Sequence, residues 1–203
     1  MNKLNKSREA LNLAINIVKD KYGNYENWYW HEKGMNEYGI IVLNSIVNSG
    51  DVLDVGSGWN TISIAAHLMG NQVISVDLFT EPTPFDGIKI IKNNIQDPEF
   101  ELGQKFDYIL LLEVLEHLNF NVKPTLLKLK SWLKDDGYLI ISTPDKIRFN
   151  ENLPDIILPE YDKNIQVKDS HIRFYDEDDL DYLEIESKIE IGPRNIYYVK
   201  GGK

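Results

Sequence analysis

The sequence predicts an α/β fold, a doubly wound and mostly parallel sheet of seven strands with helices on both faces and an antiparallel hairpin at the C-terminal end. Three observations predict it. Short apolar runs alternate with segments in which apolar residues recur at helical spacing. The run at 106–112 is apolar apart from Asp107, which is typical of a parallel strand buried on both faces. Two β-rich runs, 185–191 and 196–200, flank a Gly-Pro-Arg-Asn turn, as strands of a hairpin do.

The expected elements follow one another along the chain. Apolar residues at helical spacing predict helices at 4–20, 35–48, 60–69, 113–118 and 124–133, and a short acidic helix at 176–183. Strands are predicted at 51–55, 73–77, 88–91, 106–112, 138–142, 185–191 and 196–200. Residues 78–87 and 145–175 are expected to be loops, and a loop as long as the second is usually a lid or a binding segment.

Composition bounds the classes of protein to which the chain can belong. With 203 residues, 42% hydrophobic and 27% charged, it predicts a globular chain with a sizeable core. The net charge of −10 disfavours a large nucleic-acid interface, which would need clustered Lys and Arg. The absence of Cys excludes disulfides, zinc thiolate sites and a cysteine nucleophile. No apolar run has the length of a signal core or a membrane span, so we predict a cytoplasmic protein without a membrane partner; the oligomeric state is unknown.

A glycine turn between a predicted strand and a predicted helix is the most informative segment. Asp54 lies two residues before Gly56, at the end of the strand, and Gly58 leaves the backbone open to a ligand. A carboxylate beside the pyrophosphate of a dinucleotide would repel it, whereas it would attract an ammonium group. The turn therefore predicts a positively charged nucleoside without phosphate, a description that S-adenosylmethionine fits. The alternative is that Asp54 only caps the helix.

A second acid supports this ligand. Asp77 ends the next predicted strand, 23 residues after Asp54, as one strand–helix–strand unit requires. A carboxylate at that place can accept hydrogen bonds from both ribose hydroxyls. The alternative is an ordinary turn residue.

Four segments resemble a known family. They are LDVGSGWN (53–60), FDYILLLEVLEHL (106–118), GYLIISTPD (137–145) and DSHIRFYDEDDL (169–180). In order and spacing they resemble the class I S-adenosylmethionine-dependent methyltransferases of the type 11/23 branch, from about residue 35 to the C-terminus. The resemblance implies a Rossmann-like methyltransferase fold and an enzyme that moves a methyl group to a small-molecule acceptor, with oxygen as the expected atom. It divides one compact domain into an N-terminal helical and aromatic cover at 1–34 and the methyltransferase domain at 35–203.

The resemblance also assigns the cofactor contacts. The cofactor-binding residues that it implies are Asp54, Gly56, Ser57, Gly58, Asn60, Asp77, Leu78, Asn94, Ile95 and Glu113. The methionine end would lie at Asp54 and the glycine turn, and the ribose at Asp77. Asn94, with Asp97 as its competitor, would accept from the adenine amino group. Asn60 stands where the family often has a third glycine, and Asn tolerates left-handed dihedral angles.

Removal of a proton from an oxygen acceptor needs a base or a metal. We predict Glu113, His117 and His171 as the catalytic residues, with His117 or His171 as the base and no metal; His31 is a further candidate. Positions 113, 116 and 117 would share one face of a helix. The E-x-x-E-H pattern with a distant His also resembles the metal site of small-RNA 3′-terminal 2′-O-methyltransferases.

Alternatives therefore stay open. A metal-dependent RNA 2′-O-methyltransferase is one, although the negative charge speaks against it. A non-catalytic subunit that keeps the methyltransferase fold is another. The aromatic stretch at 22–31 would either cover the acceptor pocket or only pack against the sheet.

Overall fold

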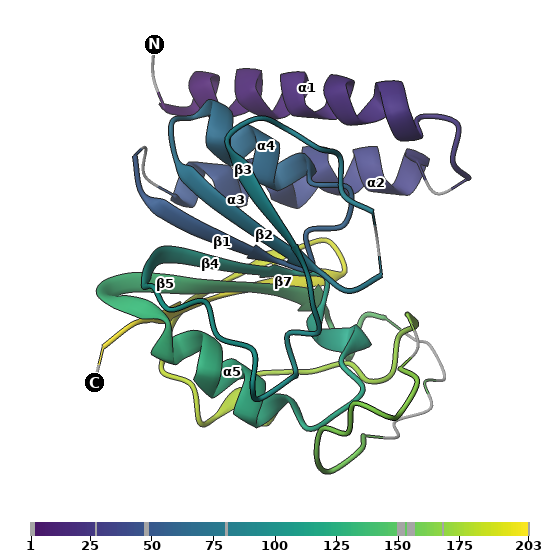
Figure 1. The fold of residues 1–203 in the computed structure, drawn as a ribbon, viewed down its shortest axis with the longest axis vertical. Coiled ribbons are helices and arrows are strands. Elements are labelled where there is room, and N and C mark those ends of the chain that lie inside the picture. Colours follow the sequence, from purple (N-terminus) through teal and green to yellow (C-terminus); the bar gives the residue numbers. More distant parts are fainter. Residues whose placement is uncertain are drawn as a thin grey trace. The chain divides into compact units, whose positions relative to one another are not determined.

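The computed structural model describes residues 3–26, 28–46, 49–79, 81–149, 153, 157–167 and 169–202. The chain forms two compact units, Met1–Lys92 and Asn93–Lys203 (Figure 1). The boundary predicted between residues 34 and 35 stays a prediction. None of the described helices is both long and apolar enough to cross a membrane.

The first unit combines a parallel sheet with a helical layer (Figure 1). Its helical elements are α1 (Lys3–Tyr22), α2 (Trp28–Gly34), η1 (Met35–Gly39), α3 (Ile40–Ser45) and α4 (Thr61–Leu68). Its strands are β1 (Asp51–Val55), β2 (Gln72–Asp77) and β3 (Ile88–Lys92), in the spatial order β3-β2-β1 and all parallel. Because parallel strands end at the same edge of a sheet, the carboxyl ends of β1 and β2 bring the glycine turn and Asp77 together.

Helical periodicity places α1 correctly. Leu11, Ile15 and Val18 recur at helical spacing and are buried, on the side of α1 that packs against α4. The predicted helix at 4–20 is thus confirmed, and so are the strands at 51–55, 73–77 and 88–91, within a residue at either end.

The helix predicted at 35–48 begins earlier in the structure than in the prediction. Helical backbone starts at Trp28 rather than at 35, runs through the wider π turn of η1 and continues into α3. Trp28 is buried and donates its indole N–H to Glu32 one turn later, so the aromatic stretch extends the helix instead of preceding it. The last two residues of the predicted range, 47–48, lie outside the described residues.

The second unit holds four strands. They are β4 (Phe106–Leu112), β5 (Leu133–Pro144), β6 (Ile185–Ile191) and β7 (Arg194–Lys200), in the spatial order β4-β5-β7-β6. β4 and β5 are parallel, whereas β7 is antiparallel to both β5 and β6, which confirms the predicted C-terminal hairpin. The helix α5 (Val122–Ser131) and the short 3₁₀ helices η2 (Leu115–His117) and η3 (Asp178–Leu180) complete the described elements of this unit.

β7 begins at Arg194, two residues before the predicted start, and β5 and α5 differ more. β5 begins at Leu133, five residues early, because Leu133 already pairs with Phe106 before a bulge leads to the pair Tyr108–Tyr138. α5 occupies Val122–Ser131 instead of 124–133, because the Asn121 side chain accepts from the Lys123 N–H and caps the helix there.

The helices predicted at 113–118 and 176–183 are wrong; each place has only a single 3₁₀ turn. Glu113 has a left-handed backbone with φ of 55°, and Leu118 is extended, so η2 cannot be prolonged at either end. At η3, the Asp176 carboxylate accepts from the Asp179 N–H, which favours a tight turn over a longer helix.

Candidate active site

The glycine turn of the first unit adopts the backbone that the sequence predicts. Gly56, Gly58 and Asn60 have φ of 69°, 52° and 74°, all in the left-handed region, so Asn60 takes the conformation expected of the third glycine. The Gly56 N–H donates to Val76 O at 2.7 Å, which ties the turn to β2. A Cβ added at Gly58 would meet no atom within 4 Å, so its backbone borders open space.

Asp54 is buried behind this turn, with 3% of its surface exposed. Its carboxylate accepts from the Ser63 hydroxyl at 2.7 Å, in the first turn of α4. Burial raises the pKa of Asp54 to about 6, and the charge of Asp77 adds to the shift, whereas hydrogen bonds from the Ser63 hydroxyl and backbone oppose it. Because Asp54 bonds to the start of α4, a capping role is present, and cofactor binding by Asp54 stays a prediction.

The Asp77 carboxylate accepts backbone hydrogen bonds from the glycine turn and from the segment that follows β2. Its two carboxylate oxygens accept from the Gly58 N–H and the Phe79 N–H, each at 2.9 Å. A cavity of about 310 Å³ lies beside it, and Leu78 is half-buried next to it. The other residues that line this cavity are Lys21, Glu81, Pro82, Pro84, Ile90, Ile91 and Lys92. A nucleoside thus has room beside Asp77 within the first unit.

The aromatic stretch packs on the glycine turn through Trp59. The Trp59 ring lies between Tyr22, at 5.0 Å, and Trp28, at 5.9 Å between centroids, both nearly parallel to it. His31 contacts the same ring and shares a 2.8 Å hydrogen bond with Thr61. Burial lowers the pKa of His31 to about 4, against the charge of Glu32, so this side chain is a weak base. These contacts support packing for this part of the stretch.

Glu113 ends β4 in the second unit, where both oxygens of its carboxylate are engaged. Ser142 donates its hydroxyl to one oxygen at 2.8 Å, and Arg194 donates Nε–H to the other at 2.6 Å. Sequence reasoning missed Ser142 and Arg194, because they come from β5 and β7 and carry no spacing signal toward Glu113. These bonds hold the Glu113 carboxylate in place, in an ion pair with Arg194.

The two predicted histidines do come together, and Glu116 joins them. The rings of His117 and His171 lie 4.8 Å apart between centroids, at 72° to each other. One ligand atom from each of Glu116, His117 and His171 lies within 4.8 Å of the others, a set that Glu113 does not join. The expectation that residues 113, 116 and 117 share a helical face is therefore wrong, since the turn is a 3₁₀ turn. The Ile172 N–H donates to Glu116 O at 2.7 Å and holds the segment of His171 in place.

The polar surroundings of this cluster can serve two kinds of chemistry. Burial raises the pKa of Glu116 well above its usual range, and the charge of Glu113 adds to the shift, whereas the Thr143 hydroxyl opposes it. Asp169 lies 3.3 Å from His117 Nδ1, and this contact with His117 lowers the Asp169 pKa. One carboxylate and two imidazoles suit a divalent cation, and a histidine paired with a carboxylate also suits proton transfer.

The predicted adenine contacts are turned toward their own backbone. Asn94 Oδ1 accepts from the Gln96 N–H at 2.9 Å, and Asp97 Oδ1 accepts from the Glu99 N–H at 2.9 Å. Ile95 between them is buried. Neither Asn94 nor Asp97 is favoured by this geometry, so the choice between them stays open.

A family model described as a methyltransferase domain matches residues 35–183. The chain belongs to this family. The resemblance to class I S-adenosylmethionine-dependent methyltransferases is thereby confirmed, and the predicted cofactor is the one that this class uses. Among curated proteins, the ubiquinone biosynthesis O-methyltransferase of Rickettsia prowazekii is 27% identical over 168 residues, 71% of this chain. The alignment covers only 65% of that relative.

Solved structures show the fold. The CcbJ methyltransferase from Streptomyces caelestis matches 80% of this chain and 88% of its own, with a TM-score of 0.63 at 12% identity. An S-adenosylmethionine-dependent methyltransferase from Clostridium acetobutylicum matches 89% and 93%, with a TM-score of 0.55 at 18% identity. This likeness confirms the predicted doubly wound, mostly parallel fold with antiparallel C-terminal strands.

Proposed function

We propose that this chain transfers the methyl group of S-adenosylmethionine to an oxygen atom of a small molecule. Membership of the methyltransferase family supports the donor, and the similarity to the O-methyltransferase of Rickettsia prowazekii supports oxygen as the acceptor atom. The observation that carries the proposal is the contact between His117 and His171, with Asp169 beside His117. A cytoplasmic location and the absence of a nucleic-acid partner remain predictions of the sequence.

In the first unit, Asp54 would attract the ammonium group of the methionine end, and Asp77 would accept from the ribose hydroxyls. Open space beside Gly58 and the cavity beside Asp77 support these two roles. Ser57, Asn60 and Leu78 keep the roles that the resemblance assigns. So do Asn94, Ile95 and Glu113 of the second unit.

The reaction is an in-line displacement at the methyl carbon. The acceptor oxygen forms a bond to that carbon, the bond from carbon to sulfur breaks, and the electron pair leaves with sulfur as S-adenosylhomocysteine. His117 or His171 takes the proton of the acceptor hydroxyl, which makes the oxygen a better nucleophile. Most of the remaining acceleration comes from positioning and from exclusion of water.

Binding and turnover test the proposal separately. Calorimetry with S-adenosylmethionine, S-adenosylhomocysteine and NAD should detect the first two and not NAD. Binding of NAD alone would contradict the cofactor assignment. Incubation with methyl-labelled S-adenosylmethionine and a set of phenols, catechols and amines should then label an oxygen, and mass spectrometry of the product identifies the atom. Label on nitrogen or carbon would contradict the oxygen assignment and leave the cofactor assignment standing.

The cluster favours a second candidate, a metal-dependent methyl transfer, in which Glu116, His117 and His171 bind a divalent cation that lowers the pKa of the acceptor hydroxyl. RNA ends are one acceptor class for such an enzyme. Activity that EDTA abolishes and Mg²⁺ or Mn²⁺ restores would replace the metal-free base with this mechanism. Activity unchanged by EDTA would exclude it.

A further inference from the structure

A second cavity lies in the second unit and shares no lining residue with the histidine cluster. It has a volume of about 190 Å³. The residues that line it are Asn121, Val122, Lys123, Ile157, Arg173, Tyr175, Asp179 and Tyr182. A cavity of roughly 150 Å³ holds a benzene molecule, so this one has room for a single ring with a small substituent.

Backbone hydrogen bonds join two of the segments that contribute lining residues to the cavity. The Asn121 N–H donates to Leu158 O at 2.8 Å, and the Leu158 N–H donates back to Asn119 O at 3.0 Å. Tyr175, on another wall, forms a bridge with Asp145 after β5. The cavity is therefore defined by paired backbone and does not depend on a chance arrangement of long side chains.

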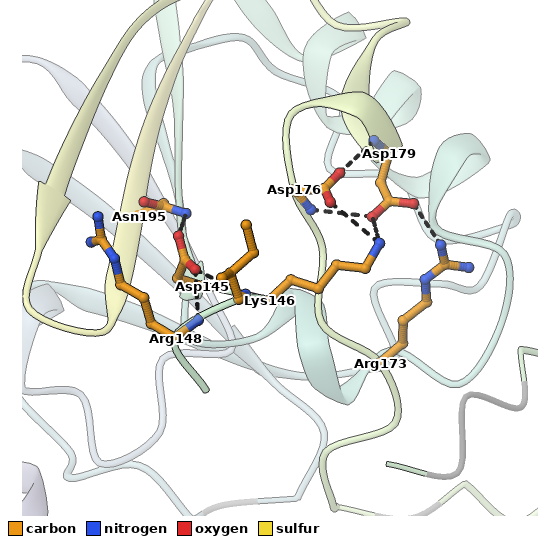
Figure 2. A network of polar contacts seen from close by, with 8 residues as sticks. Asp145, Lys146, Arg148, Arg173, Asp176, Asp179 and Asn195 are labelled. Atoms are coloured by element: carbon orange, nitrogen blue, oxygen red, sulfur yellow. Dashed lines mark hydrogen bonds and ion pairs between the residues drawn. The ribbon is translucent and has the colours of Figure 1, made fainter. Parts of the chain in front are cut away.

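One cation that lines the cavity differs from the others in having no ion-pair partner in the described part of the chain. Figure 2 shows Arg173 bonded to Asp179, and Lys146 bonded to both Asp176 and Asp179. These two cations and two carboxylates offset one another. Lys123 is different: it makes no ion pair with any residue that the structure describes, and its ammonium lies 4.7 Å from the centroid of the Tyr182 ring. A bound anion would find at Lys123 an ammonium group that no described carboxylate pairs with, in surroundings that also hold the charges of Asp179 and Asp181.

The Tyr182 hydroxyl adds a second polar group without a partner. It is buried and has no hydrogen-bond partner in the described part of the chain. Burial raises the Tyr182 pKa to about 12, with the charges of Asp181 and Asp179 adding to the shift, so the hydroxyl keeps its proton and stays a donor. An unsatisfied buried donor costs free energy.

We propose that this cavity is a binding site for a ring-sized monoanion, in which the carboxylate pairs with Lys123 and the ring packs between Val122, Ile157 and Tyr182. Neither the glycine turn nor the histidine cluster takes part in this site. The proposal therefore does not rest on methyl transfer, and binding at this cavity can be measured without the cofactor.

Benzoate is the probe, because it joins one ring to one carboxylate, and benzamide is its neutral control of the same shape. In a titration of the whole protein followed by backbone amide NMR, benzoate should change the amide chemical shifts of Lys123 and Tyr182, and these changes should saturate with benzoate concentration. It should bind about tenfold more tightly than benzamide, because only benzoate forms the charged contact.

A pair of matched variants isolates the charge. Lys123→Met keeps the length of the side chain and should lower benzoate affinity about tenfold, to the level of benzamide. Lys130→Met removes the same charge from the same helix, where Lys130 pairs with Glu184 and does not line the cavity, and should leave benzoate affinity unchanged. Equal affinities for benzoate and benzamide, shifts confined to other residues, or equal effects of the two variants would overturn the proposal.

One further arm identifies the source of the carboxylate. If 3,4-dihydroxybenzoate becomes methylated and Lys123→Met raises its KM alone, the carboxylate belongs to the acceptor. If it binds with the same dependence on Lys123 and is not methylated, the site serves a separate ligand. Both results support the site, and binding that is indifferent to Lys123 contradicts it.

Discussion

Two turns at the ends of parallel strands differ in what holds them. After β1, left-handed backbone falls on Gly56, Gly58 and Asn60, residue types that adopt it at little cost. After β4, it falls on Glu113, for which it is unfavourable. Glu113 is kept there by Ser142 and Arg194, which lie 29 and 81 positions away in the chain.

The difference shows that a turn can be built locally or from a distance. The turn after β1 carries its own conformation, and its acids bond to nearby backbone. The turn after β4 depends on the C-terminal hairpin, which supplies Arg194, and it leads directly to the Glu116–His117 pair. We therefore expect cofactor affinity to respond to substitutions in the first turn and proton transfer to respond to those after the second.

The largest expected effect concerns the histidine cluster. His171→Ala or His117→Ala, whichever removes the base, should lower kcat by roughly 10²–10⁴-fold and leave cofactor affinity nearly unchanged, because only the proton transfer is lost. Steady-state kinetics and calorimetry on each variant measure the two effects. His67→Ala, a histidine outside the cluster, is the control. A normal kcat in both cluster variants would show that neither ring is the base.

A smaller effect is expected in the turn after β1. Asp54→Asn keeps the size of the side chain and removes its charge, so S-adenosylmethionine affinity should fall by about 10–100-fold, the range for a hydrogen bond to a charged group. Calorimetry measures it, with Asp86→Asn in the exposed loop before β3 as the control. If Asp54 serves only to cap α4, Asp54→Asn will lower the melting temperature without a specific loss of affinity.

The raised pKa of Asp54 predicts a pH dependence. Since this pKa is about 6, Asp54 takes up a proton as pH falls through 6 and no longer attracts an ammonium group. Cofactor affinity should fall by about tenfold between pH 7 and pH 5. This dependence should be absent in Asp54→Asn. The stability of the ligand-free protein should depend on pH in the opposite sense. Because folding raises the pKa of Asp54, this group stabilises the folded state at low pH, and its contribution to the free energy of unfolding is lost as pH rises through 6.

The smallest effect tests the strain after β4 directly. In denaturant titrations, the free energy of unfolding of Glu113→Gly should exceed that of Glu113→Ala by about 1 kcal/mol. The reason is that glycine adopts the left-handed backbone without a steric cost. In β6, where the backbone is extended, Ser187→Ala should be more stable than Ser187→Gly. The same order at both positions would mean that the turn relaxes when the Glu113 side chain is removed.

Local patterns were enough to predict most strands and the glycine turn after β1. Alternation and apolar runs reflect burial on a sheet, and glycine reports backbone freedom, so β1, β4 and the turn at Gly56 are readable from neighbouring residues. Helical spacing failed where few residues were available to judge it. The segments 113–118 and 176–183 are too short for periodicity to separate an α-helix from a single 3₁₀ turn.

By itself, the sequence determined the family and the fold class, because both follow from motifs and patterns that are each formed by residues close together in the chain; the cofactor roles of Asp54 and Asp77 stay predictions. Only the tertiary structure decided that Glu116 rather than Glu113 joins the histidines, and that Arg194 forms an ion pair with Glu113. Those contacts join segments from different strands and turns, and no spacing along one segment records them. Which side chains gather around His117 and His171 therefore depends on long-range packing, whereas the conformation of the glycine turn after β1 does not.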